Sequence, residues 1–241
     1  MPTPGKDQIS GSFRSTHRLG EDTGWMVLYP PGFTHGDRLP VLVTLHGTDA
    51  SEDTPWVLRW QETAPQLAAE GLPPFACVGV AGGNTWWHRR ADGNDSGSMV
   101  VEELLPLLRG MELDVSKPAL YGYSMGGVGA IWLATQLGRA KVSSVVAAST
   151  PFIPSYEAGQ GAYDSPEDFA QHDIRALWPR LEGIPVRIDI GSLDGFLPTN
   201  RAFIPTAQPV PEFYVSPGDH SRDFWGKVAL DELRFVAKHF A

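Results

Sequence analysis

Short apolar runs alternate along the chain with longer stretches in which apolar residues recur at helical spacing. The runs that predict buried strands are 41–45, 75–80, 119–121, 142–147 and 186–190, with a further apolar run at 213–215. The stretches that predict helices are about 57–69, 99–109, 125–137 and 223–239. Strands that alternate with helices predict an α/β fold, in which a mostly parallel central sheet carries helices on both faces.

The N-terminal part of the chain departs from this alternation. Two apolar runs, 13–19 and 25–29, flank the turn-forming residues 20–24 and predict an antiparallel hairpin at the edge of the sheet. We expect residues 1–11 to be flexible and residues 1–241 to form a single domain, because α/β folds of this length are commonly undivided.

The segment 150–183 also breaks the alternation. It contains four prolines together with aromatic residues that look exposed, namely Phe152, Tyr156 and Tyr163. We interpret it as an irregular excursion that passes over the active site.

Composition excludes several classes of protein. The net charge of −9 argues against a nucleic-acid partner, and no apolar stretch is long enough to span a membrane. A single cysteine, Cys77, excludes an internal disulfide. The N-terminus is polar and has no apolar leader, so we expect a cytoplasmic protein, or an exported one if a signal peptide was removed. The oligomeric state is left open.

A candidate nucleophile lies where a predicted strand meets a predicted helix. The sequence Gly122-Tyr123-Ser124-Met125-Gly126 follows the run 119–121 and precedes the helical stretch 125–137. A serine in such a turn presents its hydroxyl at the sheet edge, and glycine two residues away on each side avoids collisions with neighbouring backbone. The pattern predicts that Ser124 is a catalytic nucleophile rather than part of a glycine-rich packing turn.

A serine nucleophile needs a base, and His220 is the best candidate. It follows the apolar run 213–215 and precedes the last helix, whereas His172 falls too early in the chain and His239 lies near the end of that helix. We therefore predict that His220 is the general base.

Two aspartates compete for the third position. Asp194 comes directly after the strand 186–190 and precedes His220, as the chain order of such triads requires. Asp219 is the rival, but a side chain adjacent in sequence to His220 is poorly placed to reach its Nδ1. We predict Asp194 as the acid.

The oxyanion hole requires two N–H donors. One belongs to the residue after the nucleophile, Met125, and the other to the loop after the first core strand, His46-Gly47-Thr48. We predict Thr48 as the second donor, with Gly47 as the alternative.

The loop after the strand 75–80 is the candidate specificity surface. It contains Trp86, Trp87 and His88, which we predict as substrate contacts; core packing of one tryptophan is the alternative. The nearby acidic residues Asp92, Asp95, Glu102 and Glu103 fit no metal-binding spacing and are interpreted as a solvated stretch. We expect no metal and no cofactor.

Together these motifs resemble the α/β-hydrolase superfamily, and within it the esterase branch that holds esterase D-like enzymes and mycobacterial mycolyltransferases. The resemblance rests on Leu45-His46-Gly47, the Ser124 motif, Asp194 and Gly218-Asp219-His220 followed by Trp225. The mycolyltransferases carry Asp-Gly-Leu-Arg at the oxyanion loop, and this chain does not.

The resemblance implies a serine esterase that hydrolyses a small-molecule ester through an acyl-enzyme. Three alternatives stay open: acyl transfer to an alcohol or sugar, a non-catalytic ligand-binding member of the fold and, remotely, cofactor-free haloperoxidase chemistry.

Overall fold

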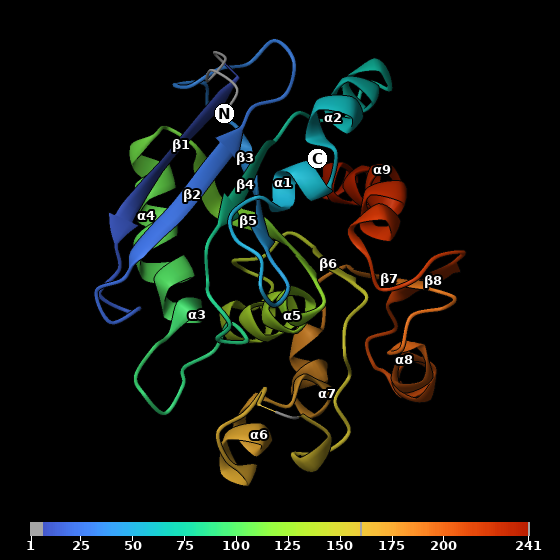
Figure 1. The fold of residues 1–241 in the computed structure, drawn as a ribbon. Helices are drawn as coiled ribbons and strands as arrows, with labels where there is room; N and C mark the ends of the chain where they lie inside the picture. The colour runs from blue at the N-terminus through green and yellow to red at the C-terminus, as the bar shows by residue number, and fades with distance from the viewer. Residues whose placement is uncertain (1–6, 160, 241) are drawn as a thin grey trace.

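The computed structural model describes residues 7–159 and 161–240, and these residues form one eight-stranded sheet with helices on both faces (Figure 1). The strand order is β1-β2-β4-β3-β5-β6-β7-β8. The strands are β1 Gln8–Arg14, β2 Asp22–Leu28, β3 Pro40–Leu45, β4 Ala76–Val80, β5 Asp114–Tyr123, β6 Val145–Ala148, β7 Val186–Gly191 and β8 Glu212–Ser216. All neighbours from β4 to β8 pair in parallel, which confirms the predicted fold class.

The N-terminal hairpin lies at the sheet edge as predicted, but its first strand is displaced. β1 pairs with β2 and β2 pairs with β4, both antiparallel. Residues 8–11, predicted to be flexible, are paired in β1, and that prediction is wrong; residues 1–6 lie outside the described part. The run 15–19 forms a loop instead of a strand, because the buried Arg18 guanidinium turns inward to the Thr23 hydroxyl and the Ala81 carbonyl.

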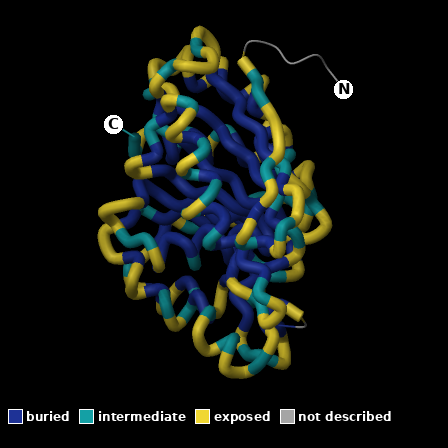
Figure 2. The backbone as a smooth tube through the Cα atoms, turned by 90° about the vertical axis from the view of Figure 1, so that its left-hand side faces the viewer, coloured by how far each residue is buried: buried dark blue, intermediate teal, exposed yellow. Residues whose placement is uncertain are grey.

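Two layers of helices cover the sheet. One face carries α1 Thr54–Val57, α2 Trp60–Ala69 and α9 Arg222–Lys238, and the other carries α3 Ser96–Met99, α4 Leu105–Gly110, α5 Met125–Leu137 and α7 Ile174–Leu177. A π-helical turn, Val100–Leu104, joins α3 to α4. The predicted helix over 57–69 is interrupted at Arg59, which has a left-handed φ of 50°. Figure 2 shows the buried strands in the interior and the exposed loops at the periphery.

The segment 150–183 is more regular than predicted. It contains α6 Pro166–His172 and α7, and Ser165 caps the start of α6 because its hydroxyl accepts the Asp168 N–H. Phe152 and Tyr163, expected to be exposed, are buried, because both pack in aromatic clusters with neighbouring helices. Short 3₁₀ helices occupy Glu157–Gly159 and Trp178–Leu181, and beyond this segment lie α8 Leu197–Phe203 and a 3₁₀ helix at Ile204–Thr206.

None of the helices within residues 7–159 and 161–240 combines the length and apolar character that crossing a bilayer requires.

A buried acid on α9 makes stability depend on pH. Glu232 is fully buried against the sheet, and burial, reinforced by the nearby Asp189 carboxylate, raises its pKa well above the ordinary value. Its carboxyl stays protonated in the fold at pH values where the unfolded chain ionises it, above about 4.3. The free energy of unfolding therefore decreases as pH rises, because ionising Glu232 is harder in the folded than in the unfolded chain.

We expect Glu232→Gln to remove this dependence. Urea unfolding at pH 5 and pH 8 measures it: the variant should gain stability relative to wild type at pH 8 compared with pH 5. The exposed Glu182→Gln serves as the control. Equal pH dependence of wild type and Glu232→Gln would contradict the assignment.

Candidate active site

Ser124 occupies a strained turn between β5 and α5. Its φ is 55° and its ψ is −124°, a conformation that holds the side chain away from both elements. A Cβ on Gly122 would lie 1.9 Å from the Gly126 carbonyl oxygen, and a Cβ on Gly126 would lie 2.0 Å from the Leu45 carbonyl oxygen. The two glycines are therefore required by backbone contacts, which is the physical reason for the Gly-x-Ser-x-Gly spacing.

Ser124, His220 and Asp194 form one hydrogen-bonded chain. The distance from Ser124 Oγ to His220 Nε2 is 3.0 Å, and that from His220 Nδ1 to Asp194 Oδ2 is 2.9 Å. Asp194 follows β7, His220 follows β8, and Ser124 follows β5, so the three meet at the carboxyl edge of the sheet. The Asp194 side chain is fully buried, while the imidazole of His220 is one-third exposed (33%).

The surroundings of Asp194 favour its ionised form. Burial raises the pKa of this carboxyl, but the hydrogen bonds from His220, the Phe196 N–H and Ser149 outweigh burial and lower the pKa below its ordinary value. The carboxylate thus accepts the Nδ1–H of His220, which leaves Nε2 free to accept the Ser124 hydroxyl hydrogen. The rival Asp219 is hydrogen-bonded to the Ser221 hydroxyl instead.

Backbone of the loop after β3 passes directly beside Ser124. A Cβ on Gly47 would lie 2.8 Å from the Tyr123 ring and 3.2 Å from the Ser124 Cβ, so a side chain does not fit there. Thr48 follows in an exposed turn, and Met125 begins α5, where the first N–H groups have no partner within the helix. Gly47 and Met125 therefore lie next to the nucleophile, and Thr48 continues the same loop; the assignment of oxyanion donors among them stays a prediction.

His46 holds this loop in place, a role that sequence reasoning missed. Its Nε2 accepts the Gly82 N–H at 2.8 Å, and its Nδ1 donates to the Gly47 carbonyl at 2.6 Å. Burial lowers the pKa of His46, although the Gly47 carbonyl has the opposite effect. The lowered pKa keeps the imidazole neutral, so that Nε2 can accept the Gly82 N–H. The only sequence feature that pointed to this role is the pair His46-Gly47 directly after a core strand.

Trp87 was predicted as a substrate contact, and that prediction is wrong. The side chain is fully buried, packs on Gly129, and donates its Nε1–H to the His46 carbonyl at 3.1 Å. Trp87 therefore braces the oxyanion loop from inside the core. Trp86 is half-buried and packs against both the main core and the cluster around Ile153.

His88 was also predicted as a substrate contact, and it is likewise buried, with 1% exposure. Its Nε2 lies 3.1 Å from the Ala162 carbonyl and its Nδ1 lies 3.0 Å from the Arg89 carbonyl. These contacts join the loop after β4 to the segment 150–183. The prediction for His88 is therefore wrong, because both ring nitrogens face backbone inside the protein.

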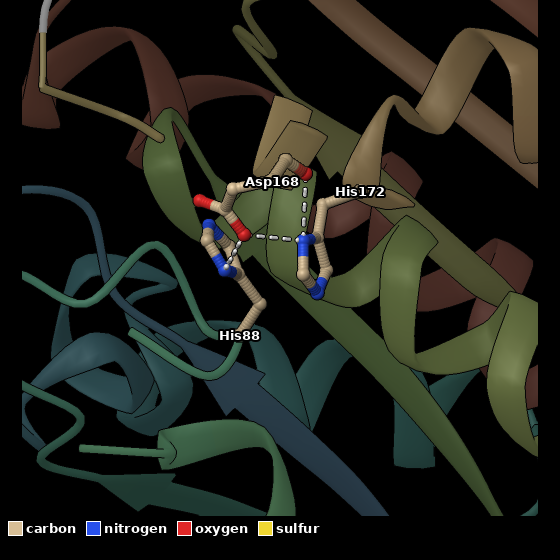
Figure 3. A group of neighbouring side chains, drawn as sticks. All are labelled: His88, Asp168 and His172. Atoms are coloured by element: carbon tan, nitrogen blue, oxygen red, sulfur yellow. Dashed lines mark hydrogen bonds and ion pairs between the residues drawn. The ribbon is translucent and has the colours of Figure 1, made fainter. Parts of the chain in front are cut away.

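His88, Asp168 and His172 lie together in a group that has metal-ligand chemistry (Figure 3). Asp168 Oδ1 is 2.8 Å from His172 Nδ1 and 3.9 Å from His88 Nδ1. The two imidazoles are stacked, with centroids 4.2 Å apart and planes inclined by 23°. Nearly parallel rings do not direct both nitrogen lone pairs at one point, and His172 Nδ1 also donates to the Asp168 carbonyl. We call this group, in which His172 is bonded to Asp168 and stacked on His88, the histidine clasp.

This clasp gives the fold a sensitivity to acid. Burial lowers the pKa of His88, the His172 imidazole lowers it further, and the Arg89 and Ala162 carbonyls and Asp168 oppose the shift. A histidine with a lowered pKa stabilises the fold above the unfolded value of about 6.5, and this contribution is lost as pH falls.

Between pH 7.5 and 5.5 the free energy of unfolding should fall less in His88→Asn than in wild type. Urea unfolding at the two pH values measures the difference. The exposed His35→Asn is the matched control and should behave as wild type. If His88→Asn loses as much stability on acidification as wild type, His88 is not the responsible group.

The acidic residues of 92–103 were predicted to form a solvated stretch, but some of them make specific hydrogen bonds. Asp95 caps α3 by accepting the Ser98 N–H, and the Glu103 carboxylate accepts hydrogen bonds from Ser15 and Thr16. These contacts anchor the N-terminal hairpin and the start of α3.

The mostly parallel eight-stranded sheet with helices on both faces is the fold of an α/β-hydrolase. The model of the family described as "Putative esterase" matches residues 16–232, and the chain belongs to this esterase family. Among curated proteins no relative matches the chain.

Solved structures share the fold at low sequence identity. A ferulic acid esterase is 21% identical with a TM-score of 0.80, covering 97% of this chain and 98% of that one. A fluorophosphonate-binding serine hydrolase from Staphylococcus aureus is 19% identical with a TM-score of 0.78, covering 95% and 98%. An S-formylglutathione hydrolase from Agrobacterium tumefaciens is 19% identical with a TM-score of 0.79, covering 99% and 98%.

Proposed function

We propose that the protein hydrolyses carboxylic esters through an acyl-enzyme formed on Ser124. The observation that supports this most directly is the continuous hydrogen-bonded chain from Ser124 Oγ through His220 to Asp194. In this proposal Ser124 is the nucleophile, His220 is the general base and acid, and Asp194 holds the imidazole and stabilises its protonated form.

The reaction then proceeds in two halves. Ser124 Oγ attacks the ester carbonyl while its proton moves to His220 Nε2, and the tetrahedral intermediate breaks the bond to the alcohol, which leaves with that proton. Water attacks the acyl-enzyme, gives a proton to His220, and releases the acid while the proton returns to Ser124. The sum is one ester and one water converted to one acid and one alcohol, without a cofactor.

Backbone N–H groups are proposed to stabilise the oxyanion in both halves. Met125 supplies one donor from the start of α5, where the helix dipole also favours negative charge. Thr48 supplies the second, with Gly47 as the alternative. The close passage of Gly47 beside the Ser124 Cβ supports this placement.

The substrate proposed is a small-molecule ester, and Trp86 is the remaining candidate contact from the loop after β4. We also propose that residues 1–241 form one domain, since the described elements share one sheet.

Turnover of p-nitrophenyl esters over a series of acyl lengths tests the proposed function, with Ser124→Ala as the control. We expect turnover by wild type and only a small residual rate, lowered by at least about 10³-fold, for Ser124→Ala. Product analysis with an added alcohol then separates hydrolysis from acyl transfer. Equal turnover by wild type and Ser124→Ala would contradict the proposal.

A further inference from the structure

The indole of Trp225 touches two members of the site's framework. Trp225 lies in the first turn of α9 and is almost fully buried. Its ring stacks on Tyr123, the residue before the nucleophile, with centroids 4.1 Å apart and planes inclined by 25°. It also meets the His220 imidazole nearly at right angles, 87°, with centroids 5.3 Å apart. Trp225 therefore limits how far the imidazole can rotate.

The indole N–H contacts a buried serine that the proposed mechanism does not use. Trp225 Nε1 donates to Ser149 Oγ at 2.9 Å. Ser149 follows β6, is fully buried, and has a left-handed φ of 48°. Its backbone N–H donates to the Asp189 carbonyl at 2.7 Å, which fixes the residue against β7.

Hydrogen-bond chemistry then sets the direction of the Ser149 hydroxyl. An indole N–H can only donate, so the Ser149 oxygen accepts from Trp225 and its own hydrogen remains for another acceptor. The acceptor beside it is the Asp194 carboxylate, whose pKa is lowered in part by the hydrogen bond from Ser149. Asp194 Oδ1 also accepts the Phe196 N–H, while Oδ2 faces His220.

We propose that Ser149 and Trp225 act together as positioning residues for the Asp194–His220 pair. The Trp225 N–H makes the Ser149 hydroxyl a donor to Asp194, and this donor holds the carboxylate at His220 Nδ1. The inference rests on the proposed function, in which His220 is the general base.

Loss of this donor has two consequences. The carboxylate is held less firmly, so kcat falls by about 10-fold, as expected for one hydrogen bond to a charged group. Without this donor the Asp194 carboxylate attracts the His220 imidazolium more strongly, so protonation of His220 becomes easier. The acid limb of the kcat/KM profile therefore moves to higher pH, an effect that looser packing alone does not produce.

The experiment compares kcat/KM from pH 5 to 9 for wild type, Ser149→Ala, Trp225→Phe and the double variant. Phenylalanine keeps an aromatic ring against Tyr123 but has no N–H. The matched control is Ser144→Ala, another fully buried serine, which lies just before the opposite end of β6 and whose hydroxyl has no partner among the described residues.

We expect Ser149→Ala and Trp225→Phe to shift the limb in the same direction. The double variant should shift the limb no further than Ser149→Ala alone, because both substitutions act on the same Ser149 hydrogen bond to Asp194. Ser144→Ala should match wild type. If Ser149→Ala does not fold, the shift in Trp225→Phe carries the test.

The inference is overturned if folded Ser149→Ala shows no shift of the limb. Where that variant does not fold, an unshifted limb in Trp225→Phe has the same meaning. A double variant whose shift equals the sum of the two single shifts also overturns it. Failure of the proposed function looks different: wild type itself then shows no acid limb, and Ser124→Ala keeps its turnover.

Discussion

Replacement of Ser124 by alanine is expected to reduce kcat for ester hydrolysis by at least about 10³-fold, since only the oxyanion hole and substrate binding remain. The hydroxyl is the atom that forms the acyl-enzyme, and no other group in the described site takes its place. Alanine adopts the strained φ of 55° at a cost similar to serine, so the variant should fold. Steady-state kinetics with a p-nitrophenyl ester measures the effect.

The matched control is Ser192→Ala, which removes an exposed hydroxyl from the loop that carries Asp194. This variant should retain wild-type kcat. A Ser124→Ala enzyme with kcat within a few-fold of wild type would show that the hydrolysis does not pass through this serine.

The second large effect is expected for Asp194→Asn, with kcat lowered by up to about 10⁴-fold. An amide in place of the carboxylate favours the wrong imidazole tautomer and no longer stabilises the imidazolium. Asp219→Asn should cost far less, because the Asp219 side chain bonds to Ser221 and not to the His220 ring. The measurement is kcat for both variants side by side, after circular dichroism shows that both are folded.

A crippled Asp219→Asn beside a nearly normal Asp194→Asn would reverse this assignment. Asp194 would then be a turn residue whose carboxylate caps the Phe196 N–H, which it also does in the structure.

Much of the fold was predictable because buried parallel strands appear in sequence as continuous apolar runs. The helix 125–137 has the predicted bounds, since a glycine-rich start and Gly138 delimit it. The position of Ser124 was predictable for a steric reason: backbone contacts of 1.9 and 2.0 Å admit only glycine at 122 and 126. The edge strand was harder, because pairing of residues 8–11 depends on β2 and not on their own sequence.

The directions of Trp86, Trp87 and His88 were not predictable from their order. Trp86 and Trp87 both adopt left-handed φ values, 58° and 64°, so no regular periodicity tells which ring points inward. The inward place of Trp87 depends on Gly129, and that of His88 depends on Ala162, both distant in sequence. The same holds for His46, whose bond to Gly82 joins two loops.

The central claim is that Ser124 is an activated nucleophile, and covalent labelling tests it most directly. Wild-type protein treated with a fluorophosphonate should gain one adduct in its intact mass, and peptide mass spectrometry should place that adduct on Ser124. Labelling should slow as pH falls, because His220 must be neutral to accept the proton. Absence of an adduct, or an adduct on another residue with Ser124 unmodified, would contradict the account.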